Sequence, residues 1–519
     1  MATLATLSNL TARKARFVMA GAILLVLLVH IAVVGLSPTV WFDEVEIVEL
    51  GRIGAFEHTT DWSMDLVDGK VPGPGLFHVG GAMQEAAYRL TGGDFRGPRM
   101  STRISLVLAA WVCFEWLLAR RNKAWMALTG ALLLLLSPDL TRSASGARVD
   151  CWAIAALLAA CWLLNRIFPE ERRAARQFRD LGVGMLAALA LLIWPAAAFL
   201  FPLLAAEAIR LSIEERWNGG EWARRVGLAG VGVCTVLAAA WLPLHSEWQQ
   251  AAGGFAASVK QVNTVAAAGT TVGAIWTYLG NLRLIGVFLL WQPFLLPLIL
   301  LGAMTRRTVY MAAAFVVCVG LMCLTWVYVH RVNWLVPYVV VLAAGTMESP
   351  ALRRRWVAAG VTVLLALGLV WEAGFSVVAR PALAMLTRQE RDHGALVRAC
   401  RNAIGSGNIR VYTDTFQVYY AGRTLGWRLY HNPHAIGTPD WILSTDGQTF
   451  LRRMDCYLAD AGTVSDPMTN ALLRAGFTPR AEVHAENGPV SRIGRTLRSY
   501  GATGYGPYTF WRREDGGTR

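Results

Sequence analysis

The chain has 519 residues, of which 55% are hydrophobic, 16% are charged and 21 are tryptophan. Its apolar runs repeatedly reach the length that crosses a bilayer, which excludes an ordinary soluble domain and predicts a polytopic α-helical membrane protein. The formal net charge of +14 lies largely in short loops between these runs. We therefore interpret the charge as a sign of membrane topology and exclude nucleic-acid binding.

The first apolar run covers residues 18–36 and follows Arg13, Lys14 and Arg16. It is long and no small-residue cleavage motif follows it, so we predict a retained anchor and not a cleaved signal peptide. Further runs of roughly 15 to 25 residues have spanning length. With the anchor they make eleven predicted spans, the others lying near 101–119, 124–138, 151–168, 181–194, 196–211, 226–244, 278–303, 308–328, 332–348 and 356–376.

The stretch 181–211 is split into two spans at Trp194-Pro195, because proline cannot continue a helix. With eleven spans and a cytoplasmic N-terminus, the short arginine-rich loops all lie in the cytoplasm, as the positive-inside rule requires. These loops are 120–123, 172–173, 224–225, 306–307 and 353–355. The opposite face receives the loop 37–100, the turn 139–150, the loop 245–277, His330-Arg331 and everything after about residue 377.

This topology divides the chain into a membrane domain, residues 1–376, and an outer soluble domain, residues 377–519. Within the loop 37–100 we predict helices along the membrane surface, one of them over 74–91. We expect a bacterial inner membrane protein whose active site and C-terminal domain face the periplasm or the exterior.

The loop 37–100 opens with two adjacent carboxylates, Asp43 and Glu44. Paired carboxylates beside an apolar wall can supply a general base, although Glu46 and Glu49 follow and the segment could equally be a solvated acidic helix. The same loop contains Lys70, one of only four lysines among 49 basic residues, in a rigid Gly/Pro-rich turn.

From Gln389 onward the hydrophobic density falls, and a small soluble α/β domain is predicted. Its expected strands cover 409–412, 441–443 and 508–512, and its expected helices cover 393–403 and 469–475. Two of the eight cysteines, Cys400 and Cys456, fall here. They could form a disulfide or remain two buried thiols. No C-x-x-C, H-E-x-x-H or phosphate-loop motif occurs, so no metal site or cofactor is predicted.

Several short motifs follow one another along residues 15–350 in an order that resembles the GT-C superfamily of polyprenyl-phosphate-sugar glycosyltransferases. Within this superfamily, the sequence is similar to lipid A aminoarabinose transferases, rhizobial lipopolysaccharide galacturonosyltransferases and protein O-mannosyltransferases. The motifs are Asp43-Glu44, Lys70-Val71-Pro72-Gly73-Pro74, Arg103-Ile104-Ser105, Arg148-Val149-Asp150, His330-Arg331 and Trp334-Leu335-Val336-Pro337. The family often has adjacent prolines after the lysine, where this chain interposes Val71 and Gly73.

The resemblance implies an inverting, metal-independent transfer of a sugar from a polyprenyl-phosphate donor to a hydroxyl group. Asp43 would be the general base, and Glu44 would orient the acceptor or tune its neighbour. The donor phosphate would be held by Lys70, Arg103 and Arg331, and other substrate contacts would come from Arg148, Asp150 and His330.

Structural alternatives remain open for these residues. Lys70 could be a solvated turn residue, Arg103 a snorkelling cation at a span end, Arg331 a headgroup anchor and Asp150 a helix-start residue. We expect an envelope glycan or lipopolysaccharide as the acceptor, with a protein hydroxyl as the alternative.

A carrier of lipid-linked glycans is the competing class of function. Carriers generally have ionisable residues near the bilayer midplane, and here the span centres are nearly bare. A cleft walled by Asp43 on the outer face would favour the transferase, and a site at the midplane would favour the carrier.

Overall fold

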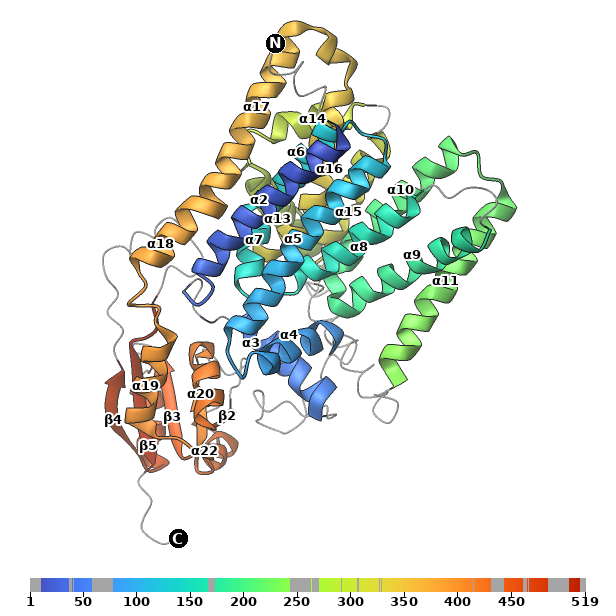
Figure 1. Ribbon diagram of the computed structural model, residues 1–519. Coiled ribbons are helices and arrows are strands. Elements are labelled where there is room, and N and C mark those ends of the chain that lie inside the picture. Colours follow the sequence, from blue (N-terminus) through green and yellow to red (C-terminus); the bar gives the residue numbers. More distant parts are fainter. Residues whose placement is uncertain are drawn as a thin grey trace.

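A computed structural model describes residues 11–36, 40, 42–57, 78–166, 173–242, 263, 270–290, 292–305, 308–325, 327, 329–413, 415–430, 443–460, 464, 466–483 and 504–513. The chain folds into a bundle of apolar helices with a small sheet-containing unit at one end (Figure 1). Lys70 lies outside the described residues, as do residues 74–77 at the start of the predicted surface helix.

The first half of the bundle begins with the N-terminal anchor and includes two helices joined by a sharp bend of 47° at Ser137. Its elements are α2 (Ala12–Ala32), α5 (Arg96–Ala119), α6 (Ala124–Leu136), α7 (Pro138–Ser145), α8 (Asp150–Leu164), α9 (Arg173–Ile193), the 3-10 helix η2 (Pro195–Leu200), α10 (Phe201–Glu214) and α11 (Gly219–Trp241).

The second half ends in a long helical stretch that leads toward the sheet (Figure 1). Its elements are α13 (Thr271–Leu290), α14 (Leu296–Ala303), α15 (Val309–Cys323), η5 (Val329–Leu335), α16 (Val336–Gly345), η6 (Thr346–Glu348), η7 (Pro350–Arg353), α17 (Arg355–Ala373), the π-helix η8 (Gly374–Ala379) and α18 (Arg380–Leu386).

Proline residues set two of the helix boundaries. The predicted break at Trp194-Pro195 is present, because α9 ends at Ile193 and η2 begins at Pro195. The predicted single span 278–303 is wrong: α13 ends at Leu290 and α14 starts at Leu296. Pro293, which lies between the two helices, has no backbone N–H to donate.

Fewer helices have spanning length than the eleven predicted. Among the described residues, six helices are long and apolar enough to cross a membrane, or seven if α6 and α7 form one bent span. Three others are apolar but shorter, over Asp150–Leu164, Val309–Cys323 and Arg331–Gly345. Sequence periodicity overestimated these lengths because it does not register where a helix gives way to a turn.

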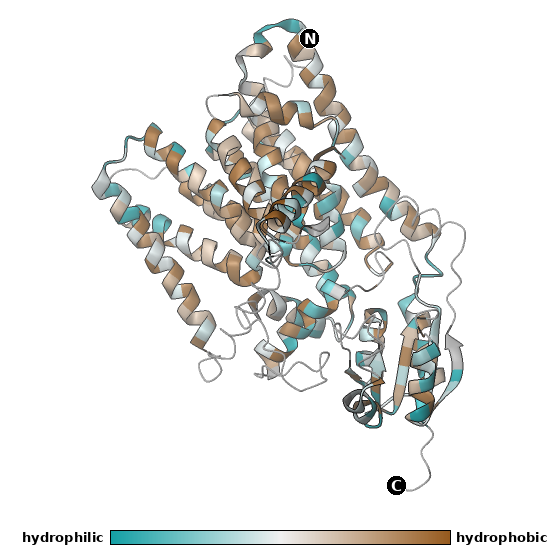
Figure 2. Cartoon of the chain, turned by 180° about the vertical axis from the view of Figure 1, so that it is seen from behind, coloured by the Kyte–Doolittle hydropathy of each residue, from teal (hydrophilic) through white to brown (hydrophobic). Residues whose placement is uncertain are grey.

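The bundle has an apolar exterior as well as an apolar core (Figure 2). Outward-facing side chains on α2, α13 and α17 are largely exposed, for example Leu25 at 60%, Trp276 at 70% and Val370 at 69%. Large apolar side chains are also packed inside, including Trp116 on α5 and Trp334 on η5. Hydrophobic surface of this kind is stable against lipid, as expected for a multi-pass membrane protein.

Ion pairs show which helix ends share one end of the bundle. Arg16 near the start of α2 pairs with Glu115 near the end of α5, at 2.7 Å. Arg120 after α5 pairs with Glu207 of α10. The predicted basic loop 120–123 therefore gathers with the C-terminal part of α10 at the N-terminal end of α2. We call this the basic end and the opposite end, where the sheet lies, the sheet end (Figure 1).

Two short helices, α3 (Phe42–Gly51) and α4 (His78–Leu90), pack together at the sheet end, with the π-helix η1 (Arg52–Glu57) continuing α3. Their backbones approach closely at Gly51 and Gly81, where a Cβ on either residue would overlap the backbone of the other. Glycine is required at this crossing because only its missing side chain allows such an approach.

The sheet has five strands in the order β2-β1-β3-β5-β4. Strands β1 (Arg410–Thr413), β2 (Arg428–Tyr430) and β3 (Cys456–Asp460) are mutually parallel, whereas β5 (Tyr508–Arg513) runs antiparallel between β3 and β4 (Phe477–Val483). The accompanying helices are α19 (His393–Ile404), α20 (Tyr419–Leu425), with the short 3-10 turn η9 (Phe416–Val418) before it, α22 (Thr445–Leu451) and α23 (Asp466–Arg474).

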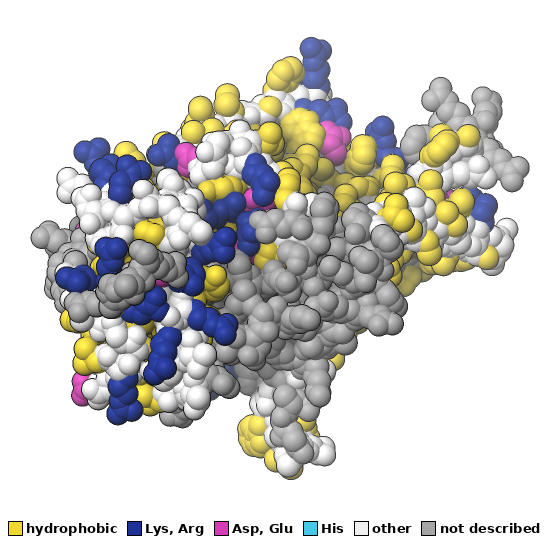
Figure 3. All heavy atoms as spheres, turned by 90° about the horizontal axis from the view of Figure 1, so that it is seen from below, with side chains coloured by type: hydrophobic (Ala, Val, Ile, Leu, Met, Phe, Trp, Pro, Cys, Tyr) yellow, Lys and Arg dark blue, Asp and Glu magenta, His cyan; other side chains and the backbone are white. Residues whose placement is uncertain are grey.

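The strands expected near 409–412 and 508–512 correspond to β1 and β5. The strand expected at 441–443 falls mostly outside the described residues, and Leu443 itself is helical. Cys400 and Cys456 are both buried free thiols and do not form a disulfide. Seen from the sheet end, many basic side chains lie on the surface (Figure 3). Arg398 and Arg428 of the sheet unit are exposed.

Buried polar contacts hold the sheet unit against α3 and α4. Arg423 of α20 pairs with Glu85 of α4 at 2.8 Å, and its guanidinium lies 4.1 Å from the ring centroid of Tyr88. The hydroxyl of Tyr419 donates to Glu49 at 2.6 Å. The carboxylates of α3 and α4 thus connect the sheet unit to the bundle.

Candidate functional site

The two carboxylates singled out by the sequence begin α3, where acidic side chains interact favourably with the helix dipole. Being adjacent on a helix, Asp43 and Glu44 point in different directions. Glu44 is fully buried and accepts two hydrogen bonds from Arg99, both at 2.9 Å. Glu44 therefore anchors α3 to α5 through a buried ion pair; the expected contact with an acceptor stays a prediction. By fixing α3, the Glu44–Arg99 pair also fixes the position of the neighbouring Asp43.

Asp43 lies on the more open side of α3. Its Oδ2 is 2.5 Å from Nη1 of Arg148, and 16% of the Asp43 side chain remains exposed, against 3% for Arg148. Ion pairing of this kind fixes the direction in which a carboxylate points. Of the two adjacent carboxylates, Asp43 is therefore the partly exposed one and Glu44 the fully buried one.

Arg148 is held from its other side by Asp150 at the start of α8. Arg148 Nε donates to Asp150 Oδ2 at 2.7 Å, and Nη2 donates to Oδ1 at 3.3 Å. The indole of Trp194 lies 5.5 Å from the guanidinium carbon. Arg148 and Asp150, which the sequence showed only as two residues of one short motif, thus form a buried ion pair. Arg148 also pairs with Asp43.

Asp150 is fully buried and accepts two more hydrogen bonds, from Ser143 Oγ at 2.6 Å and from Asn333 Nδ2 at 3.1 Å. These contacts join α7, α8 and η5 beneath Asp43. Together with Arg148, these donors satisfy the hydrogen-bonding capacity of a buried carboxylate. Asp150 therefore holds Arg148 in position; its expected contact with substrate stays a prediction.

The turn between α7 and α8 adds a strained residue next to this network. Ala147 has φ +52°, an uncommon conformation for a residue with a side chain, and its carbonyl accepts from Gln84 Nε2 at 2.9 Å. Strain of this sort costs about 1–3 kcal/mol and is retained where surrounding contacts determine the backbone. Here it directs Arg148 into the space between Asp43 and Asp150.

The net charge of the network follows from its members. Two carboxylates, Asp43 and Asp150, share the single guanidinium of Arg148, so the three groups together carry one negative charge. Asp150 offsets much of the positive charge that Arg148 presents to Asp43. Arg148 therefore orients Asp43 while part of its own charge is balanced by Asp150.

The predicted phosphate-binding cations are not all brought together with Asp43. Arg103 is 99% buried in α5, within electrostatic range of Arg99 and Glu44. Arg331 lies on η5, two residues before Asn333, and its guanidinium carbon is 5.3 Å from the ring centroid of Phe199. The side chain of His330, like Lys70, is outside what the structure describes. Arg331 is thus the described cation best placed beside the network.

A hollow of about 1030 Å³ opens at the sheet end, between the end of α2 and the start of α19. Arg96, Arg388, Arg391 and Arg398 line it, and so do apolar residues at the end of α2. Its described lining does not include Asp43, so it does not decide between transferase and carrier. It nevertheless offers a basic and partly apolar recess at the level where a lipid headgroup would meet the bundle.

Sequence reasoning missed Arg99, Ser143 and Asn333. Arg99 precedes Arg103 by one helical turn, which was the available signal that both face the same side of α5. Ser143 and Asn333 carried no signal, because their role depends on Asp150, and Asn333 is 183 residues away. Among the described residues, no group of three or more His, Cys, Asp or Glu side chains could hold a metal ion.

No family model matches the chain, and no curated protein matches it by sequence. Solved structures do match. ArnT from Cupriavidus metallidurans bound to undecaprenyl phosphate aligns with 97% of this chain and 99% of its own, at 12% identity and TM-score 0.59. Its apo state aligns with 89% and 96%, at 14% identity and TM-score 0.58.

The mycobacterial arabinofuranosyltransferase AftD also has a similar fold, with a lower TM-score and over a smaller share of its own chain. A mutant form of AftD aligns with 97% of this chain and 42% of its own, at 14% identity and TM-score 0.54. ArnT and AftD are glycosyltransferases of the GT-C superfamily, so the resemblance noted in the sequence is confirmed at the level of the fold.

Proposed function

We propose that the protein is a membrane glycosyltransferase that transfers a sugar from a polyprenyl-phosphate donor to a hydroxyl group at the sheet end. The observation that carries the proposal is the Asp43–Arg148 contact of 2.5 Å, in which an oriented and partly exposed carboxylate lies at the edge of the bundle. The shared GT-C fold and the apolar exterior support a substrate delivered through the membrane.

In the proposed reaction, Asp43 accepts the proton of the acceptor hydroxyl. The acceptor oxygen then forms a bond to the anomeric carbon while the bond from that carbon to the phosphate oxygen breaks. The lipid phosphate leaves with the bonding electrons, and the anomeric centre is inverted. Arg331, with Lys70, would stabilise the departing phosphate by charge-assisted contacts.

The donor class is supported by the neighbour that was crystallised with undecaprenyl phosphate. We propose an envelope glycan or lipopolysaccharide acceptor, since the arginine-lined hollow at the sheet end suits an anionic amphiphile. A protein hydroxyl is the alternative. Analysis of envelope glycans from a deletion strain distinguishes them: loss of a sugar from a secreted protein, with unchanged glycans, would contradict the proposed acceptor.

Single-turnover transfer from a purified polyprenyl-phosphate sugar tests the role of Asp43. Asp43→Asn should insert and bind donor normally but lose about 10²–10⁴ in rate, the usual effect of removing a general base. Asp466→Asn, an exposed aspartate in α23 of the sheet unit, should keep wild-type turnover. Turnover of Asp43→Asn within a fewfold of wild type would refute the assignment.

The proposed orientation puts the basic end in the cytoplasm and the sheet end outside the bacterial inner membrane. Cysteines placed at two exposed positions, Arg96→Cys and Arg216→Cys, report on the two ends when the exposed Cys234 is replaced by serine. An impermeant maleimide applied to intact spheroplasts should label position 96 and not position 216. The reverse pattern would invert the topology.

A further inference from the structure

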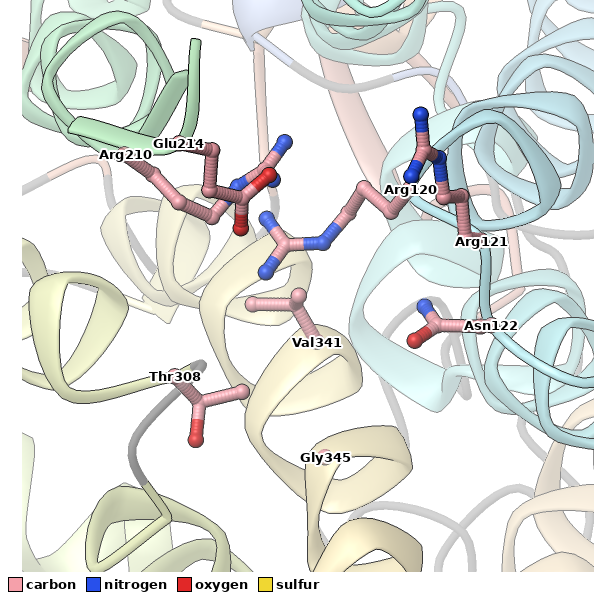
Figure 4. Close-up of a pocket in the computed structure, with 8 residues that line it drawn as sticks. All are labelled: Arg120, Arg121, Asn122, Arg210, Glu214, Thr308, Val341 and Gly345. Atoms are coloured by element: carbon pink, nitrogen blue, oxygen red, sulfur yellow. The ribbon is translucent and has the colours of Figure 1, made fainter. Parts of the chain in front are cut away.

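A second polar pocket lies at the basic end, on the far side of the bundle from Asp43. Its volume is about 280 Å³, and it is formed where α5, α10, α15 and α16 meet. Figure 4 shows Arg120 reaching toward Arg210 and Glu214 above Val341, with Arg121 beside the stem of Arg120 and with Thr308 and Gly345 on the opposite wall. The lining residues are Arg120, Arg121, Asn122, Arg210, Glu214, Thr308, Val341 and Gly345.

Two of the three arginines are committed to carboxylates. Arg120 and Arg210 both pair with Glu207, whose side chain is fully buried behind the pocket, and Arg210 also pairs with Glu214 at 2.6 Å. These contacts hold both guanidinium groups in place. Buried arginines fixed by second-layer carboxylates are pre-organised donors, and they lose little entropy when a ligand binds.

The third arginine, Arg121, differs from the other two. It is exposed and lines the pocket, and its side chain makes no polar contact with any described residue. Counting Arg120, Arg121 and Arg210 against Glu207 and Glu214, the pocket carries one positive charge in excess. Arg121 supplies that excess, and its guanidinium has all its donors available for a ligand.

The backbone at Arg121 lies in the left-handed region. Arg121 has φ +62° and follows the end of α5, where its N–H donates to Leu118 O at 2.9 Å. This left-handed position at a helix C-terminus favours glycine and is strained for any residue with a Cβ. An arginine here gives up backbone stability while placing a cation at the pocket.

We propose that this pocket binds a phosphate group. The fixed Arg120 and Arg210 and the uncommitted Arg121 suit an oxyanion with several acceptor atoms. Two sources have this chemistry: the headgroup of an anionic phospholipid, and a soluble phosphate or phosphoester. A basic pocket between helix ends at a membrane surface suits either. The site is independent of the proposed transfer reaction, because it lies at the opposite end of the bundle.

The strain at Arg121 makes a sharp test possible, because Arg121→Gly removes the cation and relieves the backbone at once. The variant should therefore fold at least as well as wild type while binding phosphate more weakly. The matched control is Arg216→Gly, since Arg216 also has positive φ (+54°) after a helix at the same end and does not line the pocket. Glu214→Gln removes a negative charge from the pocket rim and should strengthen binding.

Binding is measured on the purified full-length protein by thermal unfolding monitored through tryptophan fluorescence. One arm titrates pyrophosphate into detergent-solubilised protein. The other compares nanodiscs of phosphatidylcholine alone with nanodiscs containing phosphatidylglycerol, and native mass spectrometry detects retained lipid. Arg121→Gly should raise the apparent Kd about tenfold, the usual effect of losing one charge-assisted contact, whereas Arg216→Gly should behave as wild type.

A response to pyrophosphate alone assigns the site to a soluble phosphoester, and a response to phosphatidylglycerol alone assigns it to a lipid headgroup. Either outcome supports the phosphate site if Arg121→Gly weakens the response and Arg216→Gly does not. The proposal is overturned if wild type responds to neither probe, if Arg121→Gly responds like wild type, or if both glycine variants lose the response equally.

Discussion

The Asp43 carboxylate contacts Arg148 at 2.5 Å, and the same guanidinium donates to the buried Asp150 at 2.7 Å. One arginine therefore links the exposed carboxylate to the interior of the bundle. Arg148 has two roles that mutations can separate. It balances the charge of the buried Asp150, and it orients the carboxylate of Asp43.

Arg148→Gln should destabilise the protein by about 3–5 kcal/mol, because it leaves the carboxylate of Asp150 buried without its cation. The double variant Arg148→Gln/Asp150→Asn should recover much of that stability but not the transfer activity, since Asp43 remains unoriented. Denaturant unfolding and single-turnover assays measure the two effects. Arg142→Gln, which breaks the more exposed pair with Asp139, is the control and should cost about 0–1 kcal/mol. Strictly additive stability losses in the double variant would argue against the coupling.

Glu44→Gln should lose stability more than turnover. Glu44 and Arg99 are both fully buried, so breaking their pair should cost about 3–5 kcal/mol. Turnover per folded molecule should fall less than in Asp43→Asn, because the Glu44 side chain anchors α3 through a buried ion pair. Glu115→Gln, in a more exposed pair with Arg16, provides the comparison. Glu44→Gln with normal stability and abolished turnover would instead assign Glu44 to the reaction.

The Glu85–Arg423 pair should contribute to docking of the sheet unit on α4. A double-mutant cycle with Glu85→Gln and Arg423→Gln should give a coupling energy of about 1–3 kcal/mol, because the Glu85 side chain is fully buried. Hydrogen exchange in α20 should rise in both single variants. Tyr412→Phe, within the sheet unit and away from α4, should leave exchange in α20 unchanged; equal acceleration there would mean that general loosening, not undocking, is being measured.

Stability should fall as the pH drops from about 6.5 toward 4. Burial, together with the nearby Arg99 guanidinium, lowers the pKa of His393 to about 4, although Asp94 and Asp392 oppose the shift. In this range the unfolded chain binds a proton at His393 that the folded chain does not bind. The stability that the neutral His393 contributes to the folded state is therefore complete above about pH 6.5 and is lost as the pH approaches 4.

Replacing the imidazole should flatten this part of the stability profile. In His393→Phe the aromatic packing against Phe95, with ring centroids 4.4 Å apart in the wild type, can be retained while the titrating group is removed. Unfolding midpoints measured in steps from pH 7.5 to 4 provide the test. Asp455, whose pKa is lowered because Arg410 contacts outweigh its burial, contributes only below about 3.8 and so does not confuse the result. An unchanged slope in His393→Phe would place the titration elsewhere.

The sequence correctly predicted helix boundaries that are marked by residues next to them in the chain. The break at Pro195 and the helix beginning at His393 follow from proline geometry and from the fall in hydrophobic density. The interruption at Pro293 was overlooked, because the run around it is apolar throughout and its length suggested one span. In the candidate site, the adjacent pair Asp43-Glu44 and the motif ending in Asp150 were recognisable, but their different roles were not.

The sequence by itself determined the membrane class, the clustering of basic loops at one end and the presence of carboxylates at the other, because a bilayer responds to the length and charge of each segment separately. Only the tertiary structure decided that Glu44 is paired with Arg99, 55 residues away, and that Asn333 contacts Asp150 across 183 residues. Burial and hydrogen bonding depend on which remote helices pack together. Two adjacent carboxylates with similar local surroundings thereby become one buried anchor, Glu44, and one partly exposed side chain, Asp43.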